Sequence, residues 1–270
     1  MKLLFSEWKS DYGHYVFPYA VWAVPEPGET PADLFDLGFL PSSRHLDRFY
    51  LCRQVRVDTG RFRPSSENRR ILRKGEGITA ELIARADFDY TPARRQFCKT
   101  YADQRFGEGV MSWERLDGLF NAPITSHVLV FTDEATGAEA GLATLYREAN
   151  RMAFYYYAFY DLAYHQRSLG LHMMTTAVAF FAREAVPHLY LGSCYLPNAR
   201  YKTQFAGAEF FNGFRWSADL RELKHLIERD SGAVEQHLLE TAAFREKFYP
   251  DDLAGMAAAS RFRFTPVRAK

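Results

Sequence analysis

Apolar residues cluster in three adjacent runs in the second half of the chain. The runs cover residues 126–132, 139–146 and 152–160, and short polar segments at 133–137 and around Asn150 separate them. Runs of this length, rich in β-branched and aromatic residues and bounded by turn residues, are typical of strands. The pattern therefore predicts an antiparallel meander of three strands.

A long segment that is apolar on nearly all sides follows the meander. It begins after Ser168, extends from residue 169 to about 185 and ends before Pro187, and residues 188–192 form another apolar run. This predicts a buried helix capped by Ser168, then a strand that lies parallel to its predecessor after a right-handed crossover. This order of elements resembles the middle of a GNAT-type acyltransferase, in which two central strands diverge. We therefore predict an α+β fold, with a GNAT-like mixed sheet of splayed central strands flanked by helices.

Weaker patterns surround this unit. Thr91-Pro92 and Ser112 predict helix starts, residues 50–59 predict one strand with a cationic face, and the stretch after Asp219, including Leu238 and Leu239, predicts amphipathic helices. The opening segment, rich in proline and aromatic residues, is expected to be irregular. We divide the chain into an N-terminal subdomain (1–76), a catalytic domain (77–216) and a helical C-terminal extension (217–270).

Composition agrees with a globular protein of the cytoplasm. The chain has 270 residues, of which 47% are apolar and 25% charged, and no apolar run reaches the roughly 18–20 residues of a membrane span. Its three cysteines, Cys52, Cys98 and Cys194, show no CxxC spacing, which argues against a disulfide framework or a zinc finger and fits a reducing compartment. We expect a cytoplasmic location and no membrane partner.

Positive charge is concentrated in one segment. The net charge is only +1, but residues 44–74 hold ten Lys and Arg against three acidic residues. A local basic block on a nearly neutral protein is typical of a nucleic-acid contact, and a solvated basic face is the alternative.

The common catalytic motifs are absent: the sequence contains no GxSxG, P-loop, HExxH or dinucleotide fingerprint. The turn before the buried helix, Arg167 to His172, keeps the Arg and the first Gly of the GNAT pyrophosphate motif. His172, however, stands where a small residue is expected, which counts against coenzyme A on this turn. Tyr155–Tyr157 is expected to serve sheet packing rather than a binding box.

Two segments resemble the arginyl-tRNA–protein transferase family, and more closely its bacterial leucyl-transferring branch. The first contains Gly38-Phe39-Leu40-Pro41-Ser42, Cys52-Arg53-Gln54-Val55-Arg56-Val57 and Phe62-Arg63-Pro64-Ser65; the second contains Ser168-Leu169-Gly170, Tyr190-Leu191-Gly192 and Asn198-Ala199-Arg200-Tyr201-Lys202. The order and spacing match over residues 35–216. The resemblance implies an aminoacyltransferase that moves an amino acid from a charged tRNA to an amine, the N-terminus of a protein or peptide, as in N-degron pathways.

The chain departs from the family at its cysteine cluster. Leu46, Phe49 and Phe17 stand at or near positions where the family has cysteines, and only Cys52 remains. One thiolate cannot hold a zinc ion or an iron–sulfur cluster. We therefore expect no metal and no cofactor, with aminoacyl-tRNA as the cosubstrate.

The resemblance also implies the site residues. Tyr190, Asn198, Tyr201 and Lys202 are the candidate catalytic residues because they follow or lie on the strand at the splay and carry groups that can stabilise an oxyanion or protonate a leaving oxygen. A core role for Tyr190 and a surface role for Lys202 are the alternatives. The candidate tRNA-binding residues are Arg61, Arg63, Arg69, Arg70, Arg73, Ser168 and Gly170.

Three other functions stay open at this point. The chain could be an ordinary acyl-CoA N-acyltransferase, a tRNA-dependent enzyme that aminoacylates a small molecule or biosynthetic peptide, or a non-catalytic binding relative.

Overall fold

The computed structural model describes residues 1–7 and 9–263, and its centre is an eight-stranded mixed sheet. The strand order is β12-β11-β5-β10-β9-β8-β7-β6. The meander consists of β7 (His127–Asp133), β8 (Glu139–Glu148) and β9 (Met152–Tyr160), and β6 (Ile78–Ala84) pairs with its outer edge. On the other side of β9 lie β10 (His188–Ser193), β5 (Gln54–Asp58), β11 (Ala208–Phe211) and β12 (Trp216–Ser217).

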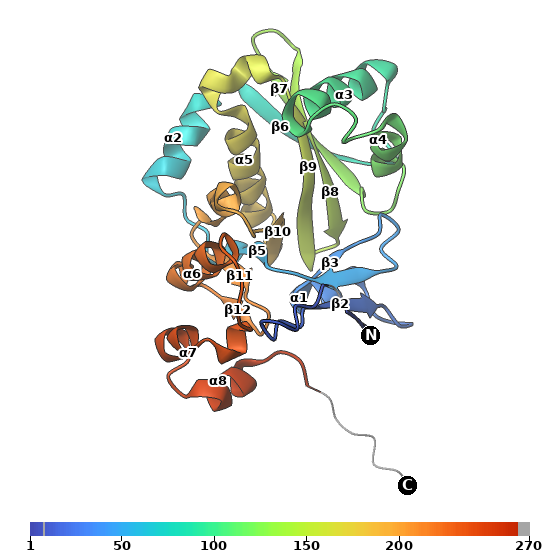
Figure 1. The fold of residues 1–270 in the computed structure, drawn as a ribbon. Coiled ribbons are helices and arrows are strands. Elements are labelled where there is room, and N and C mark those ends of the chain that lie inside the picture. The colour runs from blue at the N-terminus through green and yellow to red at the C-terminus, as the bar shows by residue number, and fades with distance from the viewer. Residues whose placement is uncertain (8, 264–270) are drawn as a thin grey trace.

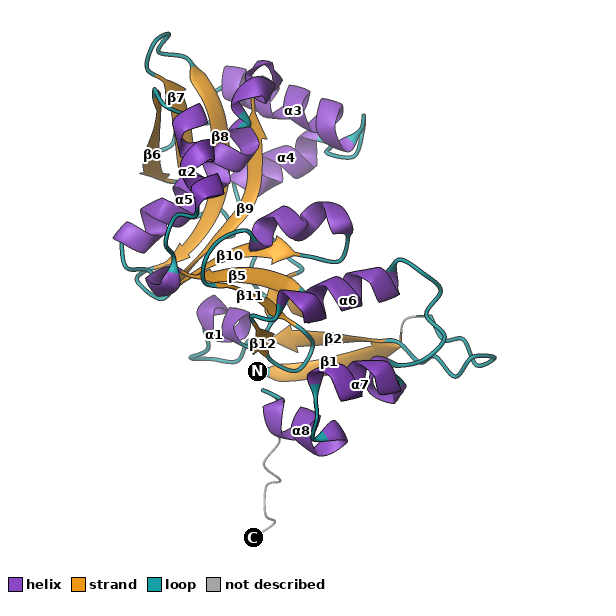
Figure 2. Ribbon diagram, turned by 90° about the vertical axis from the view of Figure 1, so that its left-hand side faces the viewer, coloured by secondary structure: helices purple, strands orange, loops and turns teal. Residues whose placement is uncertain are grey.

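The two central strands are the parallel pair, and they separate soon after they begin. β9 and β10 pair only at Leu189 with Ala153 and at Tyr190 with Phe154. Figure 2 shows that β6–β9 run steeply while β10, β5 and β11 lie across them. The predicted α+β fold, with a GNAT-like mixed sheet whose central strands splay, is therefore confirmed.

Helices cover both faces of this sheet (Figure 1). On one face lie α2 (Ser66–Lys74) and the buried α5 (Leu169–Arg183), and on the other lie α3 (Pro92–Phe106) and α4 (Trp113–Phe120). The hydroxyls of Thr91 and Ser112 accept hydrogen bonds from the third residue of α3 and α4, as the sequence predicts. Neighbouring strand residues face opposite ways, so Leu189 and Leu191 pack in the core around α5 whereas Tyr190 packs in the core around α4.

The expected single strand over residues 50–59 is wrong. The chain breaks at Cys52 and Arg53, so that β4 (Phe49–Leu51) joins a second, four-stranded sheet while β5 enters the large one. β5 is buried on both faces, and its Arg56 is no surface cation, because it forms ion pairs with Glu209 at 2.9 Å and Asp36 at 3.0 Å.

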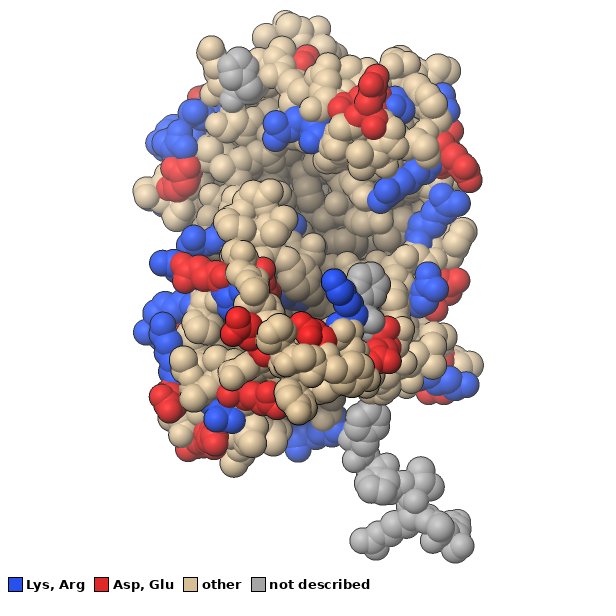
Figure 3. Space-filling view, viewed as in Figure 1, with Lys and Arg blue, Asp and Glu red and all other residues tan. Residues whose placement is uncertain are grey.

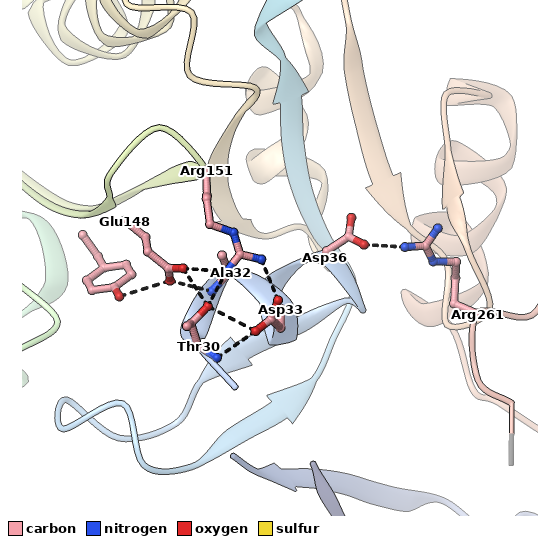
Figure 4. Close-up of polar contacts among 8 residues, drawn as sticks. Thr30, Ala32, Asp33, Asp36, Glu148, Arg151 and Arg261 are labelled. Carbon is pink, nitrogen blue, oxygen red and sulfur yellow. Dashed lines mark hydrogen bonds and ion pairs between the residues drawn. The ribbon is translucent and has the colours of Figure 1, made fainter. Parts of the chain in front are cut away.

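The N-terminal segment is more regular than expected. β1 (Lys2–Glu7) and β2 (Tyr19–Val24) form an antiparallel pair, which continues through β4 to β3 (Phe39–Pro41). The short helix α1 (Pro31–Asp36) attaches this sheet to the β8–β9 hairpin, because Glu148 accepts hydrogen bonds from Thr30 at 2.6 Å and from the Ala32 amide at 2.9 Å (Figure 4). Arg151 pairs with Asp33 at 2.6 Å beside it, and Asp36 pairs with Arg261 near the end of the described chain.

The C-terminal extension holds α6 (Leu220–Asp230), α7 (Ala242–Phe248) and α8 (Asp252–Ala259). Leu238 and Leu239 lie in a single 3₁₀ turn (Leu238–Glu240) rather than in an amphipathic helix. Residues 264–270 of the predicted extension lie outside the described residues. Within the described part of the chain, no helix is both long and apolar enough to cross a membrane. The three domain boundaries remain a prediction.

Candidate functional site

The splay between β9 and β10 opens into a cleft of about 640 Å³. In Figure 3 the middle of the molecular face is hollowed, with a largely uncharged floor and Lys and Arg side chains at the rim. Five elements line this cleft: β9, β10, the first turns of α5, the end of α3, and the segment after β10. The lining residues are Tyr101, Arg105, Phe106, Tyr155, Tyr156, Tyr157, Ala158, Tyr160, Gly170, Leu171, Met174, Leu191, Asn198, Tyr201 and Lys202.

Three of the four candidate catalytic residues meet at this cleft. Asn198, Tyr201 and Lys202 come from the 3₁₀ segment Pro197–Thr203, which follows β10 and borders the cleft. Lys202 points back toward the end of β10, where its Nζ donates a hydrogen bond to the Ser193 carbonyl at 2.9 Å. Burial lowers the pKa of Lys202. Tyr201 is 47% exposed and reaches the solvent side.

Tyr190 is not part of this group. It is 1% exposed and lies in the core on the other face of the sheet, where Arg56 approaches its hydroxyl at 3.5 Å. Burial raises the pKa of Tyr190 to about 12. Strand alternation gives the reason, because its neighbour Leu191 faces the cleft and Tyr190 must therefore face away from it.

The tyrosines of β9 line the cleft, contrary to the expectation that they only pack the sheet. Tyr155, Tyr156 and Tyr157 all reach it because β9 has no neighbour at this level on the splayed side. Tyr155 is 5% exposed, and its buried hydroxyl has no hydrogen-bond partner among the described residues. Burial raises the pKa of Tyr155 well above its usual value, so the group is a neutral donor. The sequence signal for this role is the position of these residues on the strand directly before the crossover helix.

The N-terminus of α5 is closed to a large anion. Ser168 has a φ of +53° and makes no side-chain cap, so the expected cap is absent. The Tyr160 ring lies so close to Gly170 that a Cβ there would stand 2.7 Å from its atoms, which explains the glycine. Gly170 thus borders the cleft, but beneath an aromatic ring.

Arg167 and His172, at the same helix end, also make their contacts with other parts of the protein. Arg167 donates to the Lys74 carbonyl at 3.0 Å and pairs with Asp133 at 3.3 Å. His172 is 4% exposed, and its ring lies against Gly75 at the end of α2. Burial lowers the pKa of His172. These contacts agree with the sequence argument against coenzyme A on this turn.

The five arginines predicted to bind tRNA lie on another part of the surface. Arg69, Arg70 and Arg73 are exposed on α2, and Arg61 and Arg63 lie just before it. Arg70 pairs with Glu67 at 2.6 Å, and Arg61 approaches Glu209 at 3.5 Å. None of the five lines the cleft. Their role in tRNA binding stays a prediction.

The three cysteines do not form one cluster of metal ligands. Cys52, Cys98 and Cys194 are buried and free, and burial raises the pKa of Cys52 to about 12. No group of three or more possible metal ligands occurs within residues 1–7 and 9–263. The expected lack of a cofactor is untested by this arrangement.

The chain is similar to curated bacterial transferases. It is 29% identical over 174 residues to an aspartate/glutamate leucyltransferase of Ruegeria pomeroyi, covering 62% of this chain and 62% of that protein. A protein of the same name from Pseudomonas paraeruginosa is 28% identical over 198 residues, covering 69% of this chain and 82% of that protein. The chain thus spans less than two thirds of the length of the Ruegeria pomeroyi relative. No protein-family model matches the chain.

Likeness to solved structures is distant. L-PGS from Bacillus licheniformis is 14% identical, with a TM-score of 0.38 over 52% of this chain and 44% of that one. A GCN5-related N-acetyltransferase from Sphaerobacter thermophilus is 14% identical, with a TM-score of 0.35 over 71% of this chain and 56% of that one.

Proposed function

We propose that this protein is a tRNA-dependent aminoacyltransferase that moves a leucyl group from its tRNA to the N-terminal amine of a protein or peptide beginning with Asp or Glu. The observation that carries the proposal is the cleft at the splay, where Asn198, Tyr201 and Lys202 meet as the family resemblance implies. The similarity to aspartate/glutamate leucyltransferases supports the same activity and suggests the leucyl group and the acidic acceptor.

The lining of the cleft favours leucine over arginine. Leu171, Met174 and Leu191 give it apolar surface, and none of its lining residues carries a carboxylate. A buried guanidinium without a carboxylate or an equivalent acceptor would lose its hydration uncompensated. A leucyl side chain has no such cost. The cations Arg105 and Lys202 suit an acidic acceptor or a phosphate instead.

The chemistry requires positioning and hydrogen-bond donors. A neutral amine nitrogen attacks the ester carbonyl carbon, the new C–N bond forms, and the C–O bond to the ribose breaks. The proton that the amine loses ends on the ribose oxygen. Because the ester is already activated, the reaction needs no ATP, and we propose that it proceeds without a metal or cofactor. Holding the two reactants in contact supplies most of the rate enhancement.

The residues of the cleft take separate roles in this proposal. Tyr201 donates to the oxyanion or to the leaving ribose oxygen. Tyr155 lines the cleft and has a buried hydroxyl without a partner, so it is the second candidate donor. Lys202 holds the terminal phosphate of the tRNA, and Asn198 orients the acceptor amine at the rim.

An acyl-CoA substrate fits less well. The pyrophosphate of coenzyme A usually takes the free amides at a helix N-terminus. Here the Tyr160 ring covers Gly170, and Arg167 is held by Lys74 and Asp133. We therefore place the carbonyl of an aminoacyl ester, rather than a thioester, in the cleft.

A transfer assay tests the proposal. The protein is incubated with radiolabelled leucyl-tRNA or arginyl-tRNA and with peptides that begin with Asp, Glu, Arg or Lys. We expect label on the Asp and Glu peptides from leucyl-tRNA. Acetyl-CoA with the same peptides is the matched control. Acetylation without aminoacyl transfer would reject the tRNA-dependent function, and transfer from arginyl-tRNA alone would reject the leucyl specificity.

A further inference from the structure

A second cavity beside the cleft is lined by cations. It measures about 420 Å³ and lies between the turn that joins β3 to β4 and the helix α4. Its polar lining is Ser42, Ser43, Arg44, His45, Arg48 and Arg115, and none of its lining residues carries a carboxylate. We call this cavity the basic groove.

The arginines of the basic groove carry uncompensated charge. Arg44, Arg48 and Arg115 are exposed, and none of them forms an ion pair with a described residue. Arg48 instead donates to the Ser42 hydroxyl at 3.1 Å, and Arg115 donates to the Tyr157 hydroxyl at 3.4 Å. Three guanidinium groups that line one cavity without a carboxylate are suited to bind an anion.

The basic groove adjoins the cleft. Both cavities are lined by Tyr156 and Tyr157. A smaller cavity of about 360 Å³ links them further, because its lining includes Phe106 and Tyr157 from the cleft and Arg115 from the groove. Aromatic faces therefore stand where the two cavities meet, with cations beyond them.

Arg44 packs against a glycine of α4, which leaves room for its guanidinium group. Its guanidinium lies against Gly118 in α4, where a Cβ would collide with it, and its carbonyl accepts a hydrogen bond from the Ile124 amide at 3.1 Å. A glycine inside a helix costs about 0.5–1 kcal/mol relative to alanine. The close approach of Arg44 gives a reason for it here.

We propose that the basic groove binds the phosphates of the unpaired 3′ end of the tRNA, whose terminal ester then lies in the cleft. The proposal rests on the proposed function, since only a substrate on a polyanionic chain needs cations that lead into the cleft. Guanidinium groups match phosphates bidentately, and bases of a single strand stack on aromatic rings such as Tyr156 and Tyr157. The arginines of α2 line neither cavity.

Binding of uncharged tRNA tests the groove independently of catalysis. The affinity of 5′-labelled tRNA-Leu is measured by filter binding over a range of KCl concentrations for the wild type and for R44Q/R48Q. Each lost phosphate contact on a single strand flattens the log–log salt slope by about 0.7, so the double variant should flatten it by about 1.4 and weaken binding about 25-fold at 0.1 M salt. R183Q/K224Q removes the same charge from exposed positions outside both cavities and should leave the slope unchanged.

Two further binding measurements test where on the protein the 3′ end of the tRNA lies. A tRNA that lacks its unpaired 3′ nucleotides should bind the wild type and R44Q/R48Q equally, because the variant has already lost those contacts. Gly118→Ala keeps every charge and favours the helix, yet it displaces Arg44, so tRNA binding should weaken several-fold while the thermal midpoint does not fall.

The outcomes separate this proposal from the proposed function. Salt-dependent tRNA binding that R44Q/R48Q weakens, without any transfer activity, would support the groove and reject the function. Normal transfer with an unchanged salt slope in R44Q/R48Q would reject the groove and keep the function. A salt slope that flattens only in R69Q/R70Q/R73Q would place the tRNA contact on α2. A raised KM for an acidic peptide in R44Q/R48Q, with unchanged tRNA binding, would make the groove an acceptor site. Either result overturns the proposal.

Discussion

Replacing Tyr155 by Phe should make the protein more stable and less active. The Tyr155 hydroxyl is buried and has no hydrogen-bond partner among the described residues, and the residue lines the cleft. A buried polar group without a partner costs about 1–3 kcal/mol. Removing the oxygen while keeping the ring should therefore raise the free energy of unfolding by about 1–3 kcal/mol, or the thermal midpoint by roughly 2–4 °C for each kcal/mol.

Tyr249→Phe is the matched control for this change. Tyr249 is as buried as Tyr155, but its hydroxyl accepts a hydrogen bond from Asn212 at 2.5 Å and donates one to Glu222 at 3.3 Å. The same substitution there removes satisfied hydrogen bonds and should lower the free energy of unfolding by about 1–3 kcal/mol. The two variants thus differ in sign, although each loses one oxygen atom from a buried tyrosine.

Urea denaturation and the transfer assay measure the two effects separately. If the Tyr155 hydroxyl donates to the ester in the cleft, Tyr155→Phe should lower kcat with little change in KM, since a transition-state interaction is removed. A variant less stable than the wild type would show that the hydroxyl is satisfied in the free protein. A more stable variant with unchanged kcat would show that the hydroxyl never reaches the substrate.

Three more predictions follow from the described contacts. Tyr201→Phe should lower kcat on the order of a hundredfold with little effect on KM, and a loss below about threefold would leave the phenol no role as a donor. His172, whose folded-state pKa is lowered by burial, stays neutral while the unfolded chain takes up a proton below about pH 6.5. Stability should therefore fall as the pH drops through that range, and less steeply in His172→Gln; equal slopes in urea denaturation would contradict this. Anaerobically purified protein should contain no stoichiometric zinc or iron by elemental analysis, and about one zinc or several irons per chain would refute that.

Local patterns in the sequence were sufficient for the centre of the fold. The meander, the buried helix after Ser168 and the strand at residues 188–192 are where periodicity and turn residues put them. Thr91 and Ser112 cap their helices as expected. Each of these features depends on residues within a few positions of each other, so the information needed to predict it is contained in a short window.

The basic segment shows what a short window of sequence does not predict. Residues 44–74 form one charged block in the sequence, but the fold distributes it over three environments. Arg44 and Arg48 reach the basic groove, Arg56 is buried in ion pairs, and Arg69 lies exposed on α2. A charge count along the chain cannot distinguish these places, because each depends on which element packs against the residue.

The candidate site divides in the same way. The sequence alone determined that residues 198–202 follow the strand at the splay, and that Tyr190 and Leu191 must face opposite sides of it. Only the tertiary structure decided that Leu191 and Tyr155 line the cleft, that the Tyr155 hydroxyl is left without a partner, and that Arg115 of α4 lines the same groove as Arg44. Strand alternation is a local property, so it fixes only the relative direction of neighbouring side chains. Which side chains converge on the cleft depends on the splay of β9 from β10 and on the helices that pack over the sheet. These contacts join residues far apart in the chain, so no short window of sequence contains them.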